Sequence, residues 1–285
     1  MAYTNLVIDG GGLLGPAYVG ALAALGDLAG YTRLMGVSVG SIFAMLLCIG
    51  YNIDEIGALI RDTNPKQLIN GTLIDLLSIM SSGGRSTNSV LFELVGTYIA
   101  PRFNNNPDAT FGDVFAKYRK SLVVVATAVT TNTPRYFNHL SDTDMPVRLA
   151  IKISCSIPIV FRYVVYENAP YYDGSFCQYD ILDYFASRHP GKTLALTIVP
   201  PEPRYAMAGI ELAICSLASV AVSVRRTHPD VVKIYTHLGL GSFKKCPARI
   251  DGEMYNALFQ DGFYSVKRHF GAAAASCLAG PPYAV

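Results

Sequence analysis

The sequence predicts an α/β fold with a mainly parallel sheet, and two observations support this fold class. Short apolar strand patterns at 5–9 and 31–38 alternate with helical patterns at 15–30 and 41–50, with short connections between them. Strand, helix, strand, helix in this order is typical of βαβ units, whose strands run parallel. A chain of 285 residues, with 51% hydrophobic and 15% charged residues, is also long and apolar enough to bury a large core.

The remaining elements follow along the chain in the same way. We expect helices at 53–63, 70–80, 89–103, 110–118 (capped by Thr110) and 144–156. We expect strands at 121–131, 133–139 and 192–201, and a pair of strands joined by a turn at 162–175. Mainly helical structure is expected to follow to about residue 270. No repeat or clear linker interrupts this pattern. We therefore predict a single domain over 1–285, with a core of about 5–270 and a flexible tail at 271–285.

Charge and cysteine content narrow the classes of partner and cofactor. The formal net charge is only +2, so no basic surface for nucleic acid is expected. The six cysteines are scattered without metal-ligand spacing, which predicts reduced thiols, no metal and no other cofactor. The first residues lead directly into a strand and no apolar run reaches membrane-spanning length. These features predict a cytoplasmic protein.

A glycine-rich loop, Asp9 to Gly15, follows the first predicted strand. Gly10, Gly12 and Gly15 match the dinucleotide-binding pattern, which also requires an acidic residue at the end of the second strand. That strand ends in Gly36-Val37-Ser38 instead, so no dinucleotide is expected. Unscreened peptide amides at a helix N-terminus can bind an oxyanion. The alternative is a simple tight turn between strand and helix.

A Gly-x-Ser-x-Gly sequence, Gly36 to Gly40, lies between a predicted strand and an apolar helix. This placement is typical of a nucleophile elbow, which exposes a serine hydroxyl, here Ser38. Only one predicted strand precedes it, which argues against an ordinary α/β-hydrolase with a histidine base. The five histidines are expected to be surface or structural residues, and His237 is the least implausible member of a triad.

Asp173-Gly174-Ser175 follows the last part of the predicted strand pair at 162–175. Asp-Gly is usually a turn, and a free aspartate with a pKa near 3.9 is a poor base for a hydroxyl. Burial raises the pKa of a carboxyl group, and a direct hydrogen bond favours proton transfer during attack. A Ser–Asp pair is therefore chemically workable.

The three motifs in this order, together with segments 110–138 and 145–161, resemble the patatin-like phospholipases over roughly residues 5–185. The resemblance implies a three-layer α/β/α sandwich with a mainly parallel central sheet. It also implies metal-independent hydrolysis of fatty-acyl esters of phospholipids or related lipids, with peripheral contact to membranes. By position, Ser38 is the nucleophile, Asp173 the general base, and the amides of Gly10, Gly11 and Gly12 the oxyanion hole.

The other motif glycines implied by the resemblance are Gly15, Gly36, Gly40 and Gly174. Leu14 stands where the family often has Arg or Lys, Ser175 where it commonly has Gly or Ala, and 178–182 where it has Asn-x-Pro. An acyltransferase with the same acyl-serine, or a catalytically weak lipid-binding or effector protein, remains an alternative. Composition suggests 81–89 and 209–224 as surfaces that admit lipid.

Overall fold

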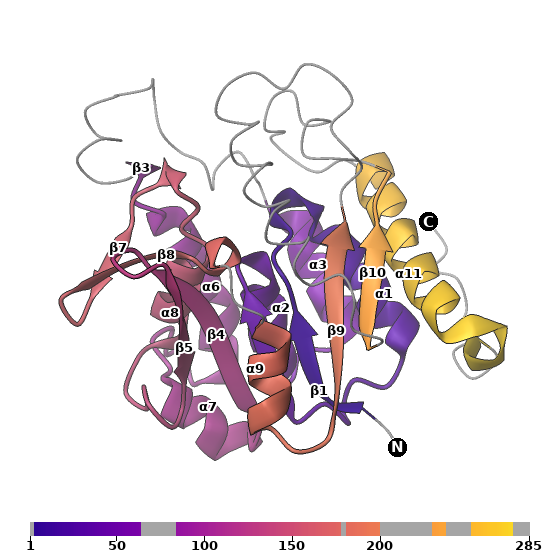
Figure 1. Ribbon diagram of the computed structural model, residues 1–285, viewed down its shortest axis with the longest axis horizontal. Helices are drawn as coiled ribbons and strands as arrows, with labels where there is room; N and C mark the ends of the chain where they lie inside the picture. Colours follow the sequence, from indigo (N-terminus) through magenta and orange to yellow (C-terminus); the bar gives the residue numbers. More distant parts are fainter. Residues whose placement is uncertain (1–2, 64–83, 178–180, 200–229, 238–251, 276–285) are drawn as a thin grey trace.

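A mixed sheet forms the centre of the molecule, seen in the computed structural model of residues 3–63, 84–177, 181–199, 230–237 and 252–275 (Figure 1). Its strand order is β10-β9-β1-β2-β4-β8-β7, with β5 also paired to β4. The strands joined by parallel pairing are β1 (Tyr3–Ile8), β2 (Arg33–Val37), β4 (Ser121–Ala128), β9 (Lys192–Val199) and β10 (Val231–Tyr235). Those added antiparallel are β5 (Thr133–Asn138), β7 (Val164–Tyr166) and β8 (Ala169–Asp173). The predicted mainly parallel sheet is confirmed.

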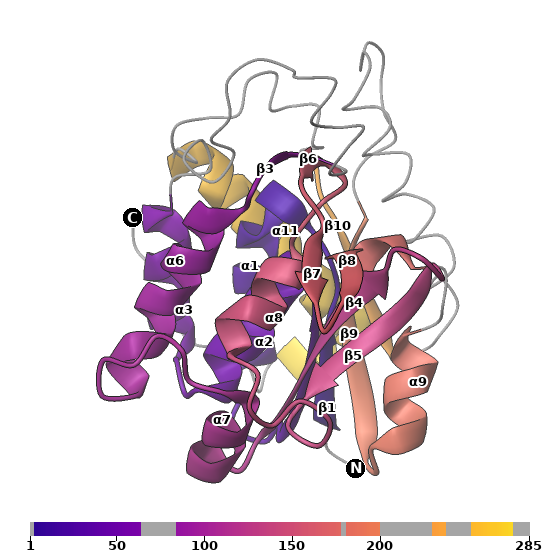
Figure 2. The ribbon, with the colours of Figure 1, turned by 90° about the vertical axis from the view of Figure 1, so that its left-hand side faces the viewer.

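Helices lie on both faces of this sheet, as Figures 1 and 2 show, with α9 (Ile181–Arg188) on the opposite face from α1, α2 and α8. The other described helices are α1 (Pro16–Leu25), α2 (Val39–Cys48), α3 (Ile53–Asp62), α6 (Ser89–Ile99), α7 (Phe111–Tyr118), α8 (Val147–Ser154) and α11 (Gly252–Ala275). Short 3₁₀ turns occur at η1 (Gly12–Leu14), η2 (Ala100–Arg102) and η3 (Gly174–Phe176). A separate two-strand sheet pairs β3 (Gly84–Ser86) with β6 (Ile159–Phe161). None of the described helices is long and apolar enough to cross a membrane.

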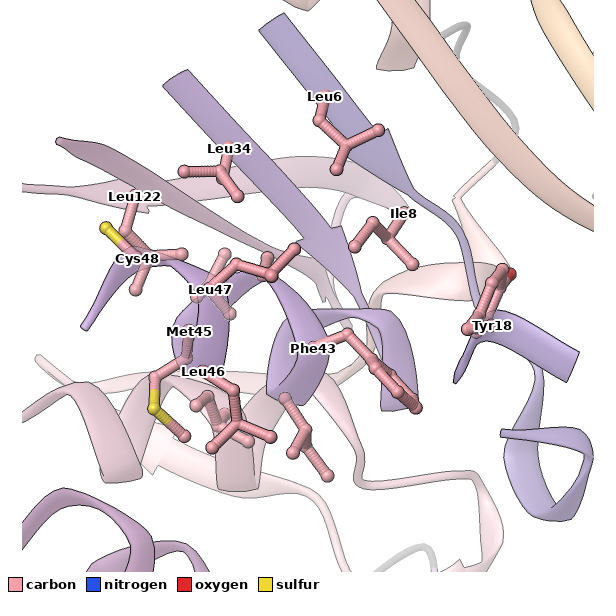
Figure 3. Packing of buried hydrophobic residues seen from close by; sticks show 14 of the residues in the cluster. Leu6, Ile8, Tyr18, Leu34, Phe43, Met45, Leu46, Leu47, Cys48 and Leu122 are labelled. Atoms are coloured by element: carbon pink, nitrogen blue, oxygen red, sulfur yellow. The ribbon is translucent and has the colours of Figure 1, made fainter. Parts of the chain in front are cut away.

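The larger hydrophobic core fills the space between the sheet and α2. Figure 3 shows Leu6, Leu34 and Leu122, from three neighbouring strands, directed toward α2, where Phe43 and Leu47 are buried. Because successive strand residues face opposite sides, the alternate residues of the same strands form a second cluster with α9. Both faces are therefore apolar, as is usual for strands in a parallel sheet.

Two sequence signals at helix ends agree with the structure, whereas α1 ends at Leu25 and α6 at Ile99, before the predicted ends at 30 and 103. Thr110 accepts a hydrogen bond from the Asp113 amide, and the Asp113 side chain accepts from the Thr110 amide, so α7 begins with a capping box. Helix α8 ends before Ile157-Pro158, as predicted. The expectation of mainly helical structure after 201 fits α11 but misses one strand, because β10 extends the sheet beside β9. Five residues are too few for a periodicity that separates strand from helix.

Several expectations fall outside the described residues. These are the helix at 70–80, the candidate lipid surface at 209–224, most of the altered stretch at 178–182, and the tail beyond 275. Of the candidate surface at 81–89, the described part forms β3 and the start of α6.

Cys48, Cys155 and Cys177 are buried free thiols.

Strand register brings two distant parts of the chain to one point. Val37, the last residue of β2, lies opposite Val125 in β4. The next residue of β4, Ala126, pairs with Asp173 at the end of β8. Ser38 directly follows Val37, so the sheet itself brings Ser38 and Asp173 to the same level of β4.

Candidate active site

Ser38 occupies a sharp turn between β2 and α2. Its backbone has φ 50° and ψ −131°, a region that is costly for a residue with a side chain, by about 1–3 kcal/mol. The neighbouring glycines permit the turn: a Cβ on Gly36 would lie 2.3 Å from Cα of Ser41, and one on Gly40 would lie 2.2 Å from the carbonyl oxygen of Ile8. The sharp strand-to-helix turn expected at Ser38 is therefore present, and both glycines are sterically required.

Hydrogen bonds on both sides hold the Ser38 backbone in this conformation. Its amide donates to Oγ of Ser154 at 2.8 Å, and Oγ of Ser154 donates to the carbonyl oxygen of Val125 at 2.6 Å. Its carbonyl oxygen accepts from Oγ of Ser41 at 2.6 Å. The side chain of Ser38 is left free for another partner.

That partner is Asp173. Oγ of Ser38 donates to Oδ2 of Asp173 at 2.6 Å, and the Ser175 amide donates to Oδ1 at 2.8 Å. Asp173 is only 1% exposed. Gly174 lets this turn approach β4, because a Cβ there would lie 2.3 Å from the carbonyl oxygen of Val125. Two residues 135 positions apart in the sequence thus form a buried hydroxyl–carboxylate pair.

Burial raises the pKa of Asp173 from 3.8 to about 6. Hydrogen bonds from Ser38 and Ser175 lower it in part, and the negative charge of Asp9 adds a smaller increase. Desolvation dominates because a carboxylate in an apolar site loses its water shell. A carboxyl group with a pKa near 6 is ionised at neutral pH and is still basic enough to accept a proton.

The glycine loop lies against the same pair. A Cβ on Gly10 would be 2.3 Å from Oγ of Ser175 and 3.5 Å from Cβ of Ser38, so a side chain there would displace the Ser175 hydroxyl. The Gly10 amide donates to Oδ1 of Asp9 at 2.7 Å, and Oγ1 of Thr197 donates to Oδ2 of Asp9 at 3.0 Å. The Gly10 amide, expected with those of Gly11 and Gly12 to form the oxyanion hole, instead donates to Asp9 in this structure.

The amides of Gly11 and Gly12 have no hydrogen-bond acceptor among the described residues. Gly12 has φ 51°, which favours glycine, and a Cβ on Gly11 would come within 2.8 Å of Cδ1 of Ile198. Gly15 differs from these, because a Cβ there would be in ordinary contact with Phe43 at 3.5 Å. Gly11 and Gly12 directly follow Gly10, which lies against Ser38, at the start of the segment that leads into α1.

None of the four described histidines hydrogen bonds to Ser38 or Asp173. His139 stacks on Phe115, and His189 lies against Phe185. The ring of His237 pairs with Asp261 of α11, whose Oδ2 also accepts from the His237 amide at 2.8 Å. His237 is therefore paired to an aspartate that is distinct from Asp173.

Sequence reasoning gave no role to several polar residues that surround the pair. Asp9, Ser41, Ser154 and Thr197 are all buried. The sequence does contain a feature that could have identified Ser154. It is a polar residue on the apolar side of a predicted amphipathic helix, where a buried hydroxyl needs a hydrogen-bond partner. Leu14, which replaces the family's cation, is 2% exposed and belongs to the core.

A family model described as patatin-like phospholipase matches residues 6–184. The chain is 30% identical over 181 residues to the uncharacterized protein R571 of Acanthamoeba polyphaga mimivirus, covering 60% of this chain and 57% of that protein. It is 30% identical over 173 residues to the probable lipid hydrolase 463L of Invertebrate iridescent virus 6, covering 60% and 59%. Triacylglycerol lipase 4 of Saccharomyces cerevisiae is 26% identical over 180 residues, covering 59% of this chain and 19% of that enzyme.

Solved structures show the same fold. VipD from Legionella pneumophila aligns with a TM-score of 0.61 at 14% identity, covering 94% of this chain and 66% of that one. The effector ExoU of Pseudomonas aeruginosa aligns with a TM-score of 0.56 at 17% identity, covering 96% and 53%. The chain thus spans less than two thirds of the length of these relatives. Because the family model covers more than half of the chain, the chain belongs to the patatin-like phospholipase family.

Proposed function

We propose that this protein is a lipid acyl hydrolase in which Ser38 is the nucleophile and Asp173 the general base. The observation that carries the proposal is the 2.6 Å hydrogen bond from Oγ of Ser38 to Oδ2 of Asp173 inside a buried site. Membership of the patatin-like phospholipase family supports the same reaction class. The relatives named probable lipid hydrolase and triacylglycerol lipase favour lipid esters as substrates.

In the first half of the proposed reaction, Oγ of Ser38 attacks the ester carbonyl while its proton passes to Oδ2 of Asp173. The carbonyl π electrons move to the oxygen, and the amides of Gly11 and Gly12 donate to this oxyanion. When the tetrahedral intermediate collapses, the leaving alcohol takes the proton from Asp173. An acyl-serine remains, and the Asp173 carboxylate is restored.

In the second half, water attacks the acyl carbon and gives one proton to Asp173. Collapse of the second intermediate breaks the bond to Ser38, whose oxygen recovers that proton, and releases the fatty acid. The N-terminus of α2 lies at Ser38, and its dipole favours negative charge at this place. No metal or histidine takes part in these steps.

The test is fatty-acid release from phosphatidylcholine and phosphatidylglycerol vesicles and from a triacylglycerol emulsion. We expect Ser38→Ala and Asp173→Asn to lower the rate by roughly 1,000-fold or more. The matched control is His237→Ala, which removes a histidine paired to another aspartate and is expected to retain the wild-type rate. Activity that survives in Ser38→Ala, or is lost in His237→Ala, would contradict the proposal.

The two substrate forms separate a phospholipase A from a neutral-lipid hydrolase. Adding a lipid alcohol such as a monoacylglycerol separates hydrolysis from acyl transfer, since a transferase would form a new ester at the expense of free fatty acid. We expect free fatty acid as the main product. A fluorophosphonate probe is expected to label Ser38, and labelling of a different residue would count against the assignment.

A further inference from the structure

The strained backbone of Ser38 requires support from outside its own turn. The first amides of a helix have no acceptor inside the helix, and Ser38 caps the N-terminus of α2. A residue with φ 50° and ψ −131° persists only where surrounding bonds hold it. The support on its amide comes from α8, a helix more than 100 positions further along the chain.

We propose that Ser154 is a positioning residue whose hydroxyl ties the Ser38 amide to the carbonyl of Val125 and so fixes the nucleophile relative to Asp173. The inference rests on the proposed function only in taking Ser38 as the nucleophile. Ser154 does not touch the reacting atoms. Its hydroxyl accepts from the Ser38 amide at 2.8 Å and donates to Val125 at 2.6 Å.

The hydroxyl of Ser154 has both of these roles fixed by its surroundings. Its single proton is given to Val125, so only lone pairs face the Ser38 amide. The residue is fully buried at the last position of α8, out of contact with bulk solvent. Removal of the hydroxyl would leave the Ser38 amide unsatisfied in the interior, which is the costly way to lose a hydrogen bond.

Val125 is also where the base is held. Its carbonyl oxygen is the atom against which Gly174 is packed, and the next residue, Ala126, pairs with Asp173. Ser38 and Asp173 are therefore both positioned by adjacent residues of β4, Val125 and Ala126. The Ser154 hydroxyl supplies the link on the side of Ser38.

Loss of this link is expected to let the turn relax toward ordinary backbone angles and move Oγ of Ser38 away from its reactive position. A displacement near 1 Å costs up to about 100-fold in rate. The effect should appear in kcat rather than KM, because the site that holds the substrate remains. The pH midpoint should not fall below that of wild type, because a weaker hydrogen bond from Ser38 raises the pKa of Asp173 while the contacts with Ser175 are unchanged.

The experiment measures the rate at which a small fluorophosphonate labels Ser38 in the folded full-length protein, across pH 5 to 8, alongside kcat and KM. The variants are Ser154→Ala, Ser154→Cys and the control Ser156→Ala. Ser156 lies two positions further on, is equally buried, and its hydroxyl donates to the carbonyl of Lys152 at 2.7 Å. Circular dichroism and thermal unfolding establish the folded fraction of each variant.

We expect Ser154→Ala to label roughly 10- to 100-fold more slowly than wild type, with an unchanged KM and a pH midpoint no lower than that of wild type. Ser154→Cys introduces a weaker hydrogen-bonding group of similar size, so its labelling rate is expected to lie between those of wild type and Ser154→Ala. Ser156→Ala is expected to label at the wild-type rate. If Ser154→Ala does not fold, Ser154→Cys provides the comparison.

A wild-type labelling rate in the folded Ser154 variant, an equal loss in Ser156→Ala, or a pH midpoint below that of wild type would each overturn the inference. Failure of the proposed function looks different. A wild-type protein that is labelled at Ser38 but releases no fatty acid would contradict lipid hydrolysis and leave the Ser154 comparison intact.

Discussion

At the scale of single residues, the side chain of Asp173 combines two properties that oppose each other. Its burial makes the carboxylate basic, with a pKa raised to about 6, and the same burial makes the charged form unfavourable in the folded protein. Hydrogen bonds from Ser38 and Ser175 offset part of this cost. A residue of this kind favours reactivity over stability, which is usual for catalytic groups.

Replacement of Asp173 by Asn is expected to stabilise the protein at high pH. Because the folded-state pKa of about 6 exceeds the ordinary value of 3.8, the folded chain binds this proton more tightly than the unfolded chain. The free energy of unfolding therefore falls as pH rises between these values and stays lower above them. At about 1.4 kcal/mol for each pKa unit, the gain of Asp173→Asn at pH 8 is at most about 3 kcal/mol.

Urea unfolding of wild type and Asp173→Asn at pH 8 and pH 4 measures this difference. The advantage of the variant is expected to shrink at pH 4, where the folded wild type already carries a neutral carboxyl group. The same difference at both pH values would show that the charge of Asp173 has no part in it.

Ser175 provides a second residue-scale prediction. The hydroxyl of Ser175 lowers the pKa of Asp173. The hydrogen bond from the Ser175 backbone amide to Oδ1 of Asp173 does not depend on the side chain. Activity is expected to fall in wild type as pH drops through about 6, where the base becomes protonated. In Ser175→Ala this fall should occur at higher pH, because the carboxylate has lost one donor.

The measurement is the pH dependence of Ser38 labelling in Ser175→Ala, wild type and the control Ser187→Ala, whose exposed hydroxyl donates to the carbonyl of Tyr184. The control is expected to match wild type. An unchanged or lower midpoint in Ser175→Ala would refute the role of the Ser175 hydroxyl.

At the scale of elements, glycines set how closely strands and helices approach around the site. Gly40 lies where the first turn of α2 passes over the end of β1, and a Cβ there would meet backbone atoms of Ile8 and Asp9 at 2.2 and 2.3 Å. Backbone cannot move aside as a flexible side chain can. The site therefore depends on the close approach of β1 and α2.

Gly40→Ala is expected to destabilise the protein by about 1–3 kcal/mol or more, since it overpacks a backbone contact. The matched control is Gly15→Ala at the start of α1, where the backbone is helical and a Cβ would meet Phe43 at an ordinary 3.5 Å. Thermal unfolding is expected to show a large loss for Gly40→Ala and little change for Gly15→Ala. Equal effects would mean that the close approach of β1 and α2 is not the cause.

At the scale of the whole molecule, the C-terminal helix α11 packs directly on the first helix, α1. A Cβ on Gly20 would lie 1.9 Å from the carbonyl oxygen of Phe259, and one on Gly262 would lie 1.8 Å from that of Ala17. The two backbones therefore touch, with a glycine from each helix at the contact. This contact closes the helical layer that covers one face of the sheet (Figure 2).

Gly20→Ala is expected to destabilise the protein although alanine favours helix over glycine by about 1 kcal/mol. The added methyl group must push α11 away from α1. Gly252→Ala, at the start of α11 with open space around it, is the control and is expected to be neutral or slightly stabilising. Thermal unfolding and limited proteolysis of α11 measure the outcome, and an equally stable Gly20→Ala protein would contradict the close contact.

The sequence alone determined the features that depend on neighbouring residues. The alternation of strands and helices over 5–50, the cap at Thr110, the end of α8 before a proline and the two elbow glycines are all local patterns. Local patterns are readable because their physical causes, such as side-chain periodicity, capping bonds and backbone angles, act over a few residues. The pairing of Ser38 with Asp173 was inferred through resemblance to a family.

Only the tertiary structure decided which distant groups meet. Strand register places Ser38 beside Asp173. Folding also lets Ser154 accept a hydrogen bond from the Ser38 amide, and Asp9 accept one from the Gly10 amide. Strand β10 belongs to the sheet because β9 pairs with it, since five residues carry too little pattern of their own. Contacts between groups far apart in sequence depend on how whole elements pack, and no local rule contains that information.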